Sequence, residues 1–310
     1  MKKGNIFILL TALAYSTQEI ANKMLVGKLD SFQITFFIFI IGAILLTPVA
    51  LKDLKAREMK LTSNDFGYFA LNALLCIPIS MSLLSFAGRY TLASTSAVIF
   101  SSNAIFTVPF AYLILKEKIN KATAISLLLG VIGVVIITVV PSSKTASSNL
   151  LGIICALGAA IAWSLFTVVS KIRISKYGGY IFNCGIFYIG ALMVLIILFA
   201  TGRPIIKGLD MHGILILIYM GLFIKALGYI FYLGAIRLTS AVTASLVFLI
   251  KPALASILAV LILGDKLKAN VLIGIAFIIV SSYIAFNSKR AAEIKRSEER
   301  RVGKECPRCV

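Results

Sequence analysis

Ten stretches of apolar residues, each long enough to cross a lipid bilayer, follow one another along most of this chain. A hydrocarbon core about 30 Å thick needs roughly 20 consecutive apolar residues in a helix. Hydrophobic residues make up 60% of the chain and charged residues 14%, whereas soluble domains carry about 25% charged residues. We therefore predict an all-α integral membrane protein with ten transmembrane helices. The predicted spans are approximately residues 5–26, 32–51, 65–88, 91–115, 120–140, 150–172, 178–201, 211–235, 238–263 and 267–287.

The basic residues lie mostly between the apolar stretches and near the end of the chain. In a soluble protein the formal net charge of +19 would suggest nucleic acid as a partner. Here no glycine-rich phosphate loop or basic–aromatic patch stands in a polar context, so we predict no nucleic-acid binding. Counting Lys and Arg in alternate connections places both termini in the cytoplasm of a protein of the cell membrane. The first apolar stretch begins like a signal peptide, but it is long enough to span, and we predict that it is retained.

The chain contains an internal duplication with a constant offset of 148 residues. Matching pairs include Ala12 and Ala160, Ser16 and Ser164, Gly42 and Gly190, Arg89 and Arg237, and Glu117 and Asp265. The offset defines two units, residues 4–140 and 150–288, with five predicted spans in each. Because five is an odd number, the two units must cross the membrane in opposite senses, an arrangement typical of secondary transporters. We predict that the basic tail, residues 289–310, is disordered and partly non-native.

Each unit has a Leu-rich fourth span that ends before an acidic residue and a lysine. These pairs are Glu117-Lys118 in the first unit and Asp265-Lys266 in the second. Together with the ten spans in two inverted units, this pattern resembles the EamA-type permeases of the drug/metabolite transporter superfamily. In that family the fourth helix carries Pro, then about a dozen residues, then Gly-Glu. Pro252 keeps that proline, whereas Pro109 is shifted and Lys116 replaces the first glycine. The resemblance covers residues 4–288 and implies the fold and a transport role, but not the substrate.

Two lysines lie deep inside predicted spans, Lys225 in the eighth and Lys251 in the ninth. A charge near the bilayer centre costs about 2.5–3.5 kcal/mol on insertion scales, so it needs a reason. One interpretation is a positive cavity between the units that binds an anionic group of the substrate. The alternative is a structural lysine that bonds helix carbonyls or extends toward water. Lys251 directly precedes Pro252, which frees a backbone carbonyl, and its counterpart in the first unit is Asn103, a further candidate for the site.

Aromatic side chains share helix faces with these candidates. Tyr229 and Tyr232 follow Lys225 at the spacing that aligns residues on one side of a helix. They are expected to bind the substrate or to contact the lysine as cation–π partners. The alternative for both is anchoring at the membrane interface, which suits Tyr232 better than Tyr229.

The first span presents a second polar face with Tyr15 and Glu19, which the offset carries onto Trp163 and Thr167. Equivalent faces on repeat-related helices are what a cavity at a repeat interface requires, so we include all four as candidate substrate-binding residues. Glu19 has three interpretations. It is a proton-coupling carboxylate, or a partner of Lys225 or Lys251 that an anionic substrate displaces, or a partner of Lys23 one turn away.

Residues for hydrolytic or metal chemistry are not found together in the sequence. There is one histidine, His212, and no paired carboxylates or Ser–His–Asp set, so we predict no enzyme activity, no metal and no cofactor. Small residues at helical spacing suit internal packing, with a homodimer as the alternative. We predict a carrier-type transporter of a small polar metabolite with an anionic group, with coupling to an ion or a proton left open. The alternatives are a broad exporter of amino acids or drugs, or a structural or sensory membrane protein that transports nothing.

Overall fold

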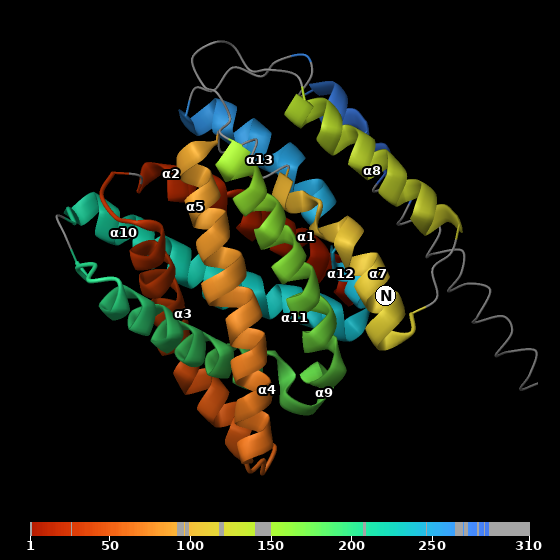
Figure 1. The fold of residues 1–310 in the computed structure, drawn as a ribbon. Helices are drawn as coiled ribbons and strands as arrows, with labels where there is room; N and C mark the ends of the chain where they lie inside the picture. The colour runs from red at the N-terminus through yellow and green to blue at the C-terminus, as the bar shows by residue number, and fades with distance from the viewer. Residues whose placement is uncertain are drawn as a thin grey trace, which may run out of the picture.

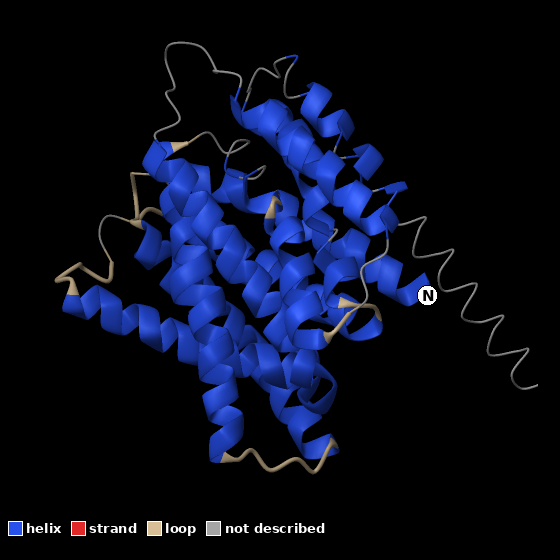
Figure 2. Cartoon of the chain, turned by 45° about the vertical axis from the view of Figure 1, so that its right-hand side comes forward, coloured by secondary structure: helices blue, strands red, loops and turns tan. Residues whose placement is uncertain are grey.

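The computed structural model describes residues 2–25, 27–91, 96, 99–117, 121–139, 150–206, 209–245, 247–263, 269, 272–277, 279–281 and 283–284. Apart from turns and short loops these residues are helical, and no strand occurs among them (Figure 2). The predicted all-α class is therefore confirmed. The tail, residues 289–310, lies outside the described residues.

The helices pack side by side as one bundle, with segments of both sequence units in contact (Figure 1). In chain order they are α1 (Lys2–Ser16), α2 (Gln18–Met24), α3 (Ser31–Ala56), α4 (Ser63–Leu74), η1 (Leu75–Met81), α5 (Ser82–Tyr90), α7 (Asn103–Leu115), α8 (Lys121–Val139), α9 (Leu150–Ala200), α10 (Met211–Tyr219), η2 (Met220–Leu227), α11 (Gly228–Leu238), α12 (Ala241–Ser245) and α13 (Val247–Leu263). The segments η1 and η2 are π-helical turns that join their neighbours into longer continuous helices.

Within the described residues, four helices are long and apolar enough to cross a membrane: Ser31–Ala56, Ser63–Tyr90, Leu150–Ala200 and Met211–Leu238. The helix Leu150–Ala200 covers the predicted sixth and seventh spans together. The described residues of the other predicted spans are mostly helical, but they form no further helix that meets these criteria. The count of ten spans and the opposite orientation of the two units therefore remain predictions.

The 51-residue helix α9 is broken at Gly178, where the backbone has φ 75° and ψ 169°. A left-handed φ of this size favours glycine. A Cβ atom at Gly178 would also lie only 2.8 Å from Arg57 Nη2. Figure 1 shows α9 turning back on itself near the lower end of the molecule, beside the start of α4. The two arms contact α3, α4, η1, α5, α7 and α11, so α9 forms the centre of the bundle.

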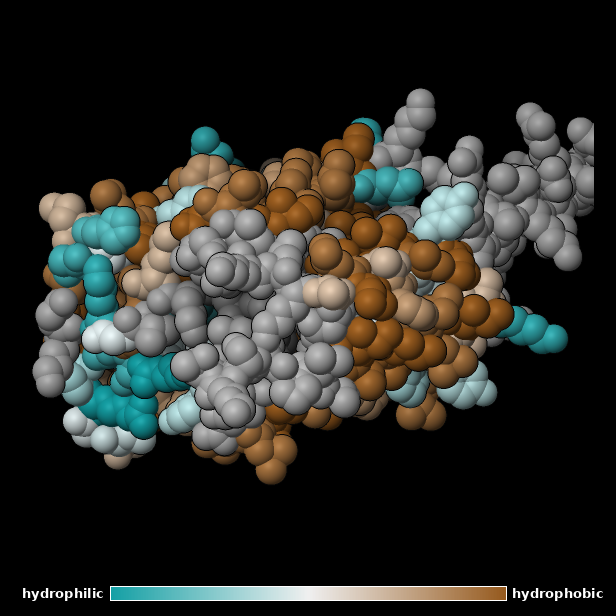
Figure 3. All heavy atoms as spheres, turned by 90° about the horizontal axis from the view of Figure 1, so that it is seen from above, coloured by the Kyte–Doolittle hydropathy of each residue, from teal (hydrophilic) through white to brown (hydrophobic). Residues whose placement is uncertain are grey.

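Large apolar side chains cover the outside of the molecule. Leu113, Leu192, Phe199, Leu215 and Leu261 are each more than half exposed. Figure 3 shows hydrophobic residues over much of one face, with hydrophilic residues gathered mainly toward one end. An apolar exterior of this extent suits lipid rather than water as the surrounding solvent.

Candidate functional site

A cluster of buried aromatic rings occupies the middle of the bundle. Tyr15 of α1 and Trp163 of α9 meet edge to face with ring centroids 6.2 Å apart. Tyr229 and Tyr232 of α11 lie 5.5 Å from the Trp163 ring, and Phe248 of α13 lies 5.6 Å from it. All five side chains are 2% exposed or less. The cluster therefore joins helices from both sequence units around one point.

Lys225 is fully buried against this cluster, in the π-helical segment η2. Its Nζ lies 4.7 Å from the centre of the Phe39 ring and 5.2 Å from that of Tyr229. It also approaches Gln18 Oε1 at 3.4 Å and Met81 Sδ at 3.5 Å. Ring faces carry partial negative charge and attract an ammonium group. These contacts therefore offset part of the free-energy cost of burying the Lys225 charge.

Lys251 is also buried, with 1% of its surface exposed. Its Nζ lies 5.1 Å from the centre of the Phe100 ring and 5.9 Å from that of Phe248. Phe248 also contacts Tyr15 and Trp163. The two buried lysines thus reach the same aromatic cluster from α13 and η2.

Several buried polar atoms of the cluster have no hydrogen-bond partner within the described part of the chain. They are Tyr15 Oη, Trp163 Nε1 and Asn103 Oδ1. The rest of the Asn103 amide is bonded, because its Nδ2 donates to the Phe100 carbonyl at 2.7 Å. A buried polar group without a partner costs about 1–3 kcal/mol. Two donors and one acceptor are therefore available here to a polar ligand.

The two π-helical segments lie at nearly equivalent places in the two units. The offset of 148 carries η2 onto residues 72–79, which overlap η1. In η1, Cys76 Sγ lies 3.4 Å from Tyr229 Oη, which ties this segment to the same cluster. Single π-helical turns inside α-helices are frequently found at functional sites. Their paired placement supports the centre of the bundle as the candidate site.

Seven of the eight predicted site residues are brought into or next to this cluster: Lys225, Lys251, Trp163, Tyr15, Asn103, Tyr229 and Thr167. Thr167 reaches it through a 2.6 Å hydrogen bond that its Oγ1 shares with Tyr232 Oη. For Glu19 only the backbone is described, in α2, and its side chain and that of Lys23 lie outside the described residues. The interface interpretation of Tyr232 is wrong, because its side chain is fully buried against Trp163 and Thr167.

Sequence reasoning missed several residues of the site. Gln18 is 4% exposed and lies beside Lys225, and its Nε2 donates to Met81 Sδ at 3.5 Å. The signal for Gln18 was present, because it follows Tyr15 by three residues and so lies near it on the same helix face. Phe100 and Phe248 carried the same signal, since they precede the candidates Asn103 and Lys251 by three residues. Phe39 had no such signal, because a phenylalanine in an apolar span does not stand out from its neighbours.

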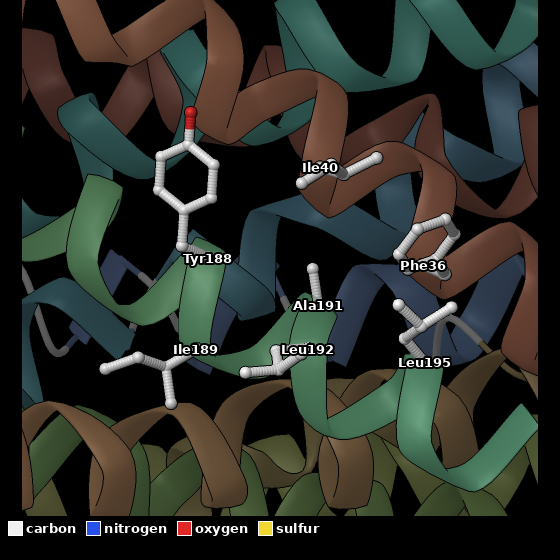
Figure 4. Close-up of a pocket in the computed structure, with 7 residues that line it drawn as sticks. All are labelled: Phe36, Ile40, Tyr188, Ile189, Ala191, Leu192 and Leu195. Carbon is white, nitrogen blue, oxygen red and sulfur yellow. The ribbon is translucent and has the colours of Figure 1, made fainter. Parts of the chain in front are cut away.

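Two surface hollows lie away from the cluster. One, of about 440 Å³, is partly polar and is lined by Gly27, Lys28, Leu29, Asp30, Gln33, Arg89 and Pro204. The other, of about 370 Å³, is an apolar groove between α3 and the second arm of α9 (Figure 4). Figure 4 shows Phe36 and Ile40 on one side of it and Tyr188, Ala191, Leu192 and Leu195 on the other. Neither hollow contains a predicted site residue.

The apolar exterior, the long helices and the buried lysines define the class of the protein, a multi-pass helical membrane protein with a polar site inside its bundle. The chain belongs to the EamA-like transporter family, whose model matches it twice, over residues 2–139 and 150–287. It is thus a transporter of the drug/metabolite transporter superfamily, and the resemblance seen in the sequence is confirmed.

Curated relatives of similar length include a protein named as a transporter. An uncharacterized transporter of Clostridium kluyveri is 57% identical over 302 residues, covering 96% of this chain and 97% of the relative. Protein PagO of Salmonella typhimurium is 23% identical, covering 96% and 98%. A protein of known crystal structure superposes with a TM-score of 0.72 at 16% identity, covering 94% of this chain and 99% of that one. At this identity the last comparison concerns the fold alone.

Proposed function

We propose that this protein is a carrier that moves a small polar metabolite with an anionic group across the cell membrane by alternating access. The observation that supports this most is the burial of Lys225 and Lys251 on the faces of aromatic rings at the centre of the bundle. Each buried ammonium group costs about 2.5–3.5 kcal/mol in a membrane. An anionic substrate that enters between them recovers part of that cost through charge-assisted hydrogen bonds.

The polar atoms of the cluster complete the proposed binding site. Tyr15 Oη and Trp163 Nε1 donate to the substrate, and Asn103 Oδ1 accepts from it. Tyr229 and Thr167 shape the site through their contacts with Trp163 and Tyr232. Glu19 remains part of the proposal in two roles, a carboxylate that carries the coupled proton or one that pairs with a buried lysine until the substrate arrives.

Alternating access follows from the two-unit organisation. In this proposal the units 4–140 and 150–288 each contribute five spans, cross the membrane in opposite senses, and move against each other around the central site. Tyr15 and Asn103 come from the first unit, and Trp163, Lys225 and Lys251 from the second, so relative movement of the units changes the site. The charge bias of the connections places both termini in the cytoplasm.

A broad exporter of amino acids or drugs is the second candidate. The observation that favours it is the aromatic wall itself, because Tyr15, Trp163, Tyr229, Tyr232 and Phe248 also suit apolar or cationic substrates. The named relatives are transporters, which favours either kind of carrier over a structural or sensory role.

The test is ligand-induced thermal stabilisation of purified protein against a panel of carboxylates, phosphates, amino acids and cations. The variants are Lys251→Met and Lys225→Met, which remove the charge but keep an unbranched side chain, and the control is Lys52→Ala at an exposed position. Each shift is measured against the same variant without ligand. We expect an anionic compound to raise the melting temperature of wild type and of the control but of neither lysine variant. Stabilisation by neutral or cationic compounds that survives both lysine changes would instead establish the broad exporter.

A further inference from the structure

A lysine–aspartate ion pair joins the two sequence units at each end of the molecule. At one end Lys176 Nζ lies 2.6 Å from Asp65 Oδ1. At the other, Lys28 Nζ lies 2.9 Å from Asp210 Oδ1 and 2.8 Å from Asp210 Oδ2. Each pair combines one residue of the first unit with one of the second. Neither pair contains a residue of the candidate substrate site.

The duplication relates the two pairs to each other. The offset of 148 carries Lys28 onto Lys176, and it carries Thr62, the N-cap of α4, onto Asp210, the N-cap of α10. Asp65 lies in the same first turn as Thr62, and its carboxylate accepts from the Thr62 amide at 2.9 Å. Both pairs therefore join the lysine after the first helical span of one unit to the first turn of the third span of the other.

The helix α3 separates the two pairs. It begins at Ser31, close after Lys28, and ends at Ala56, shortly before α4 and Asp65. A straight helix of 26 residues is about 39 Å long, which exceeds the thickness of a hydrocarbon core. In Figure 1 the start of α10 lies at the left of the molecule and the start of α4 at its lower end.

We propose that Lys176–Asp65 and Lys28–Asp210 are the two gates of the transport cycle, each closing one end of the route to the central site. This rests on the proposed alternating access, in which the units move against each other. When the units separate at one end, the ion pair that bridges them there breaks while the pair at the opposite end holds. Lys176 is 49% exposed at its side chain and Lys28 32%, so both ammonium groups stay hydrated when their gate opens.

The two gates differ in strength. Asp65 is 1% exposed and also accepts from Tyr177 Oη at 2.5 Å and from Thr62 Oγ1 at 3.0 Å. Asp210 is 53% exposed and lies near the polar hollow lined by Lys28. Exposed ion pairs are weak because water and salt screen them. The Lys28–Asp210 gate therefore opens more readily, and the resting protein is closed at the Asp65 end.

The test is hydrogen–deuterium exchange of the full-length protein in Asp65→Asn, Asp210→Asn and the control Asp53→Asn. Asp53 lies at the Asp65 end but pairs with Arg57 in its own unit, at 2.8 Å. We expect Asp65→Asn to speed exchange roughly threefold or more around residues 57–68 and 170–180 and to slow it around 25–33 and 201–212. Asp210→Asn should do the reverse, and Asp53→Asn should produce no change at the distant end.

The slowing at the opposite end distinguishes a gate from a static clamp. A clamp that is lost loosens its own end and leaves the other unchanged, so purely local changes in both variants would overturn the proposal. If Asp65→Asn does not fold, the exchanged pair Asp65→Lys with Lys176→Asp restores the bridge and should restore the wild-type pattern. Hydrogen–deuterium exchange needs no substrate, so it tests the gates independently of the proposed substrate class. If the two ends respond in opposite senses but no anionic compound raises the melting temperature, the gate proposal stands and the proposed substrate class is contradicted.

Discussion

The two ends of the molecule join the sequence units with the same chemical pair but place it in different surroundings. Asp65 accepts from Lys176, from Tyr177, and from both the amide and the hydroxyl of Thr62. Asp210 accepts from Lys28 and caps its own helix through the Gly213 amide, and more than half of its side chain is exposed. The strength of an ion pair thus depends less on its two charges than on the groups that surround them.

Aromatic packing accounts for much of the difference. At the Asp65 end, the rings of Tyr68, Phe69, Tyr177 and Phe182 stack or meet edge to face with centroids 4.8–6.3 Å apart. Tyr177 of this group donates to Asp65, whose side chain is 1% exposed. At the other end, Arg203 pairs with Asp30 at 3.5 Å, and Arg89 donates to the Leu29 carbonyl at 2.9 Å. These polar contacts lie beside the polar surface hollow, and the Asp210 carboxylate remains exposed to solvent.

Tyr177→Phe tests the contribution of the buried hydrogen bond to the Asp65 end and has the largest expected effect. It removes the hydroxyl that donates to Asp65 while keeping the ring. Hydrogen bonds to charged groups are worth about 1.5–3 kcal/mol, so we expect a loss of stability in that range, measured by denaturation in detergent. Tyr180→Phe, a partly exposed tyrosine three residues later, is the control. Equal losses in the two variants would show that the stability of the Asp65 end does not depend on this bond.

Gly185→Ala tests the ring packing at the same end. A Cβ atom at Gly185 would lie 2.8 Å from Phe69 Cδ2, and the Phe69 ring is held by Tyr177 and Phe182. Overpacking of this kind costs about 1–3 kcal/mol. Gly67→Ala is the matched control in α4, because no atom lies within 4 Å of its added Cβ. An unchanged melting temperature for Gly185→Ala would mean that the rings at this end are loosely packed.

The smallest expected effect is at the exposed end, in the pH dependence of Asp210→Asn. The Lys28 ammonium beside Asp210 lowers the pKa of that carboxyl. A carboxyl whose pKa is lower in the folded state stabilises the fold at pH values above its unfolded-state pKa of about 3.9. This stabilisation is lost as the pH falls through the folded-state pKa. The difference in melting temperature between wild type and Asp210→Asn should therefore be small at pH 6, on the order of 2 °C, and vanish at low pH. A difference that grows below pH 4 would contradict this assignment.

Much of the class and part of the site could be predicted from the sequence. Apolar length and composition predicted a helical membrane protein, and the repeated Leu-rich spans with Glu117 and Asp265 predicted the family. Lys225 and Lys251 stood out because a charge in an apolar span is rare. Tyr229 followed from its helical spacing to Lys225, and Asn103 followed from the offset that relates it to Lys251. The structure brings these residues together, while their role in binding remains a proposal.

Other features had no readable signal. Residues 173–177 looked like a connection between two spans, but α9 continues to Gly178, where one left-handed residue makes the break. Asp65 and Asp210 differ by 145 residues rather than 148, so the duplication did not pair them. Their equivalence appears only when both are seen in the first turn of a helix, each facing a lysine of the other unit.

The sequence by itself determined that this protein resides in a lipid bilayer, and it determined the helical class and the family. These properties depend on the average composition and periodicity of long segments. Tertiary structure decided which rings surround Lys225 and Lys251, which aspartate is buried, and which aspartate meets which lysine. Such contacts join residues far apart in the sequence, 182 positions in Lys28 and Asp210 and 186 in Lys225 and Phe39. They depend on how whole helices pack, and no local pattern in the chain records that packing.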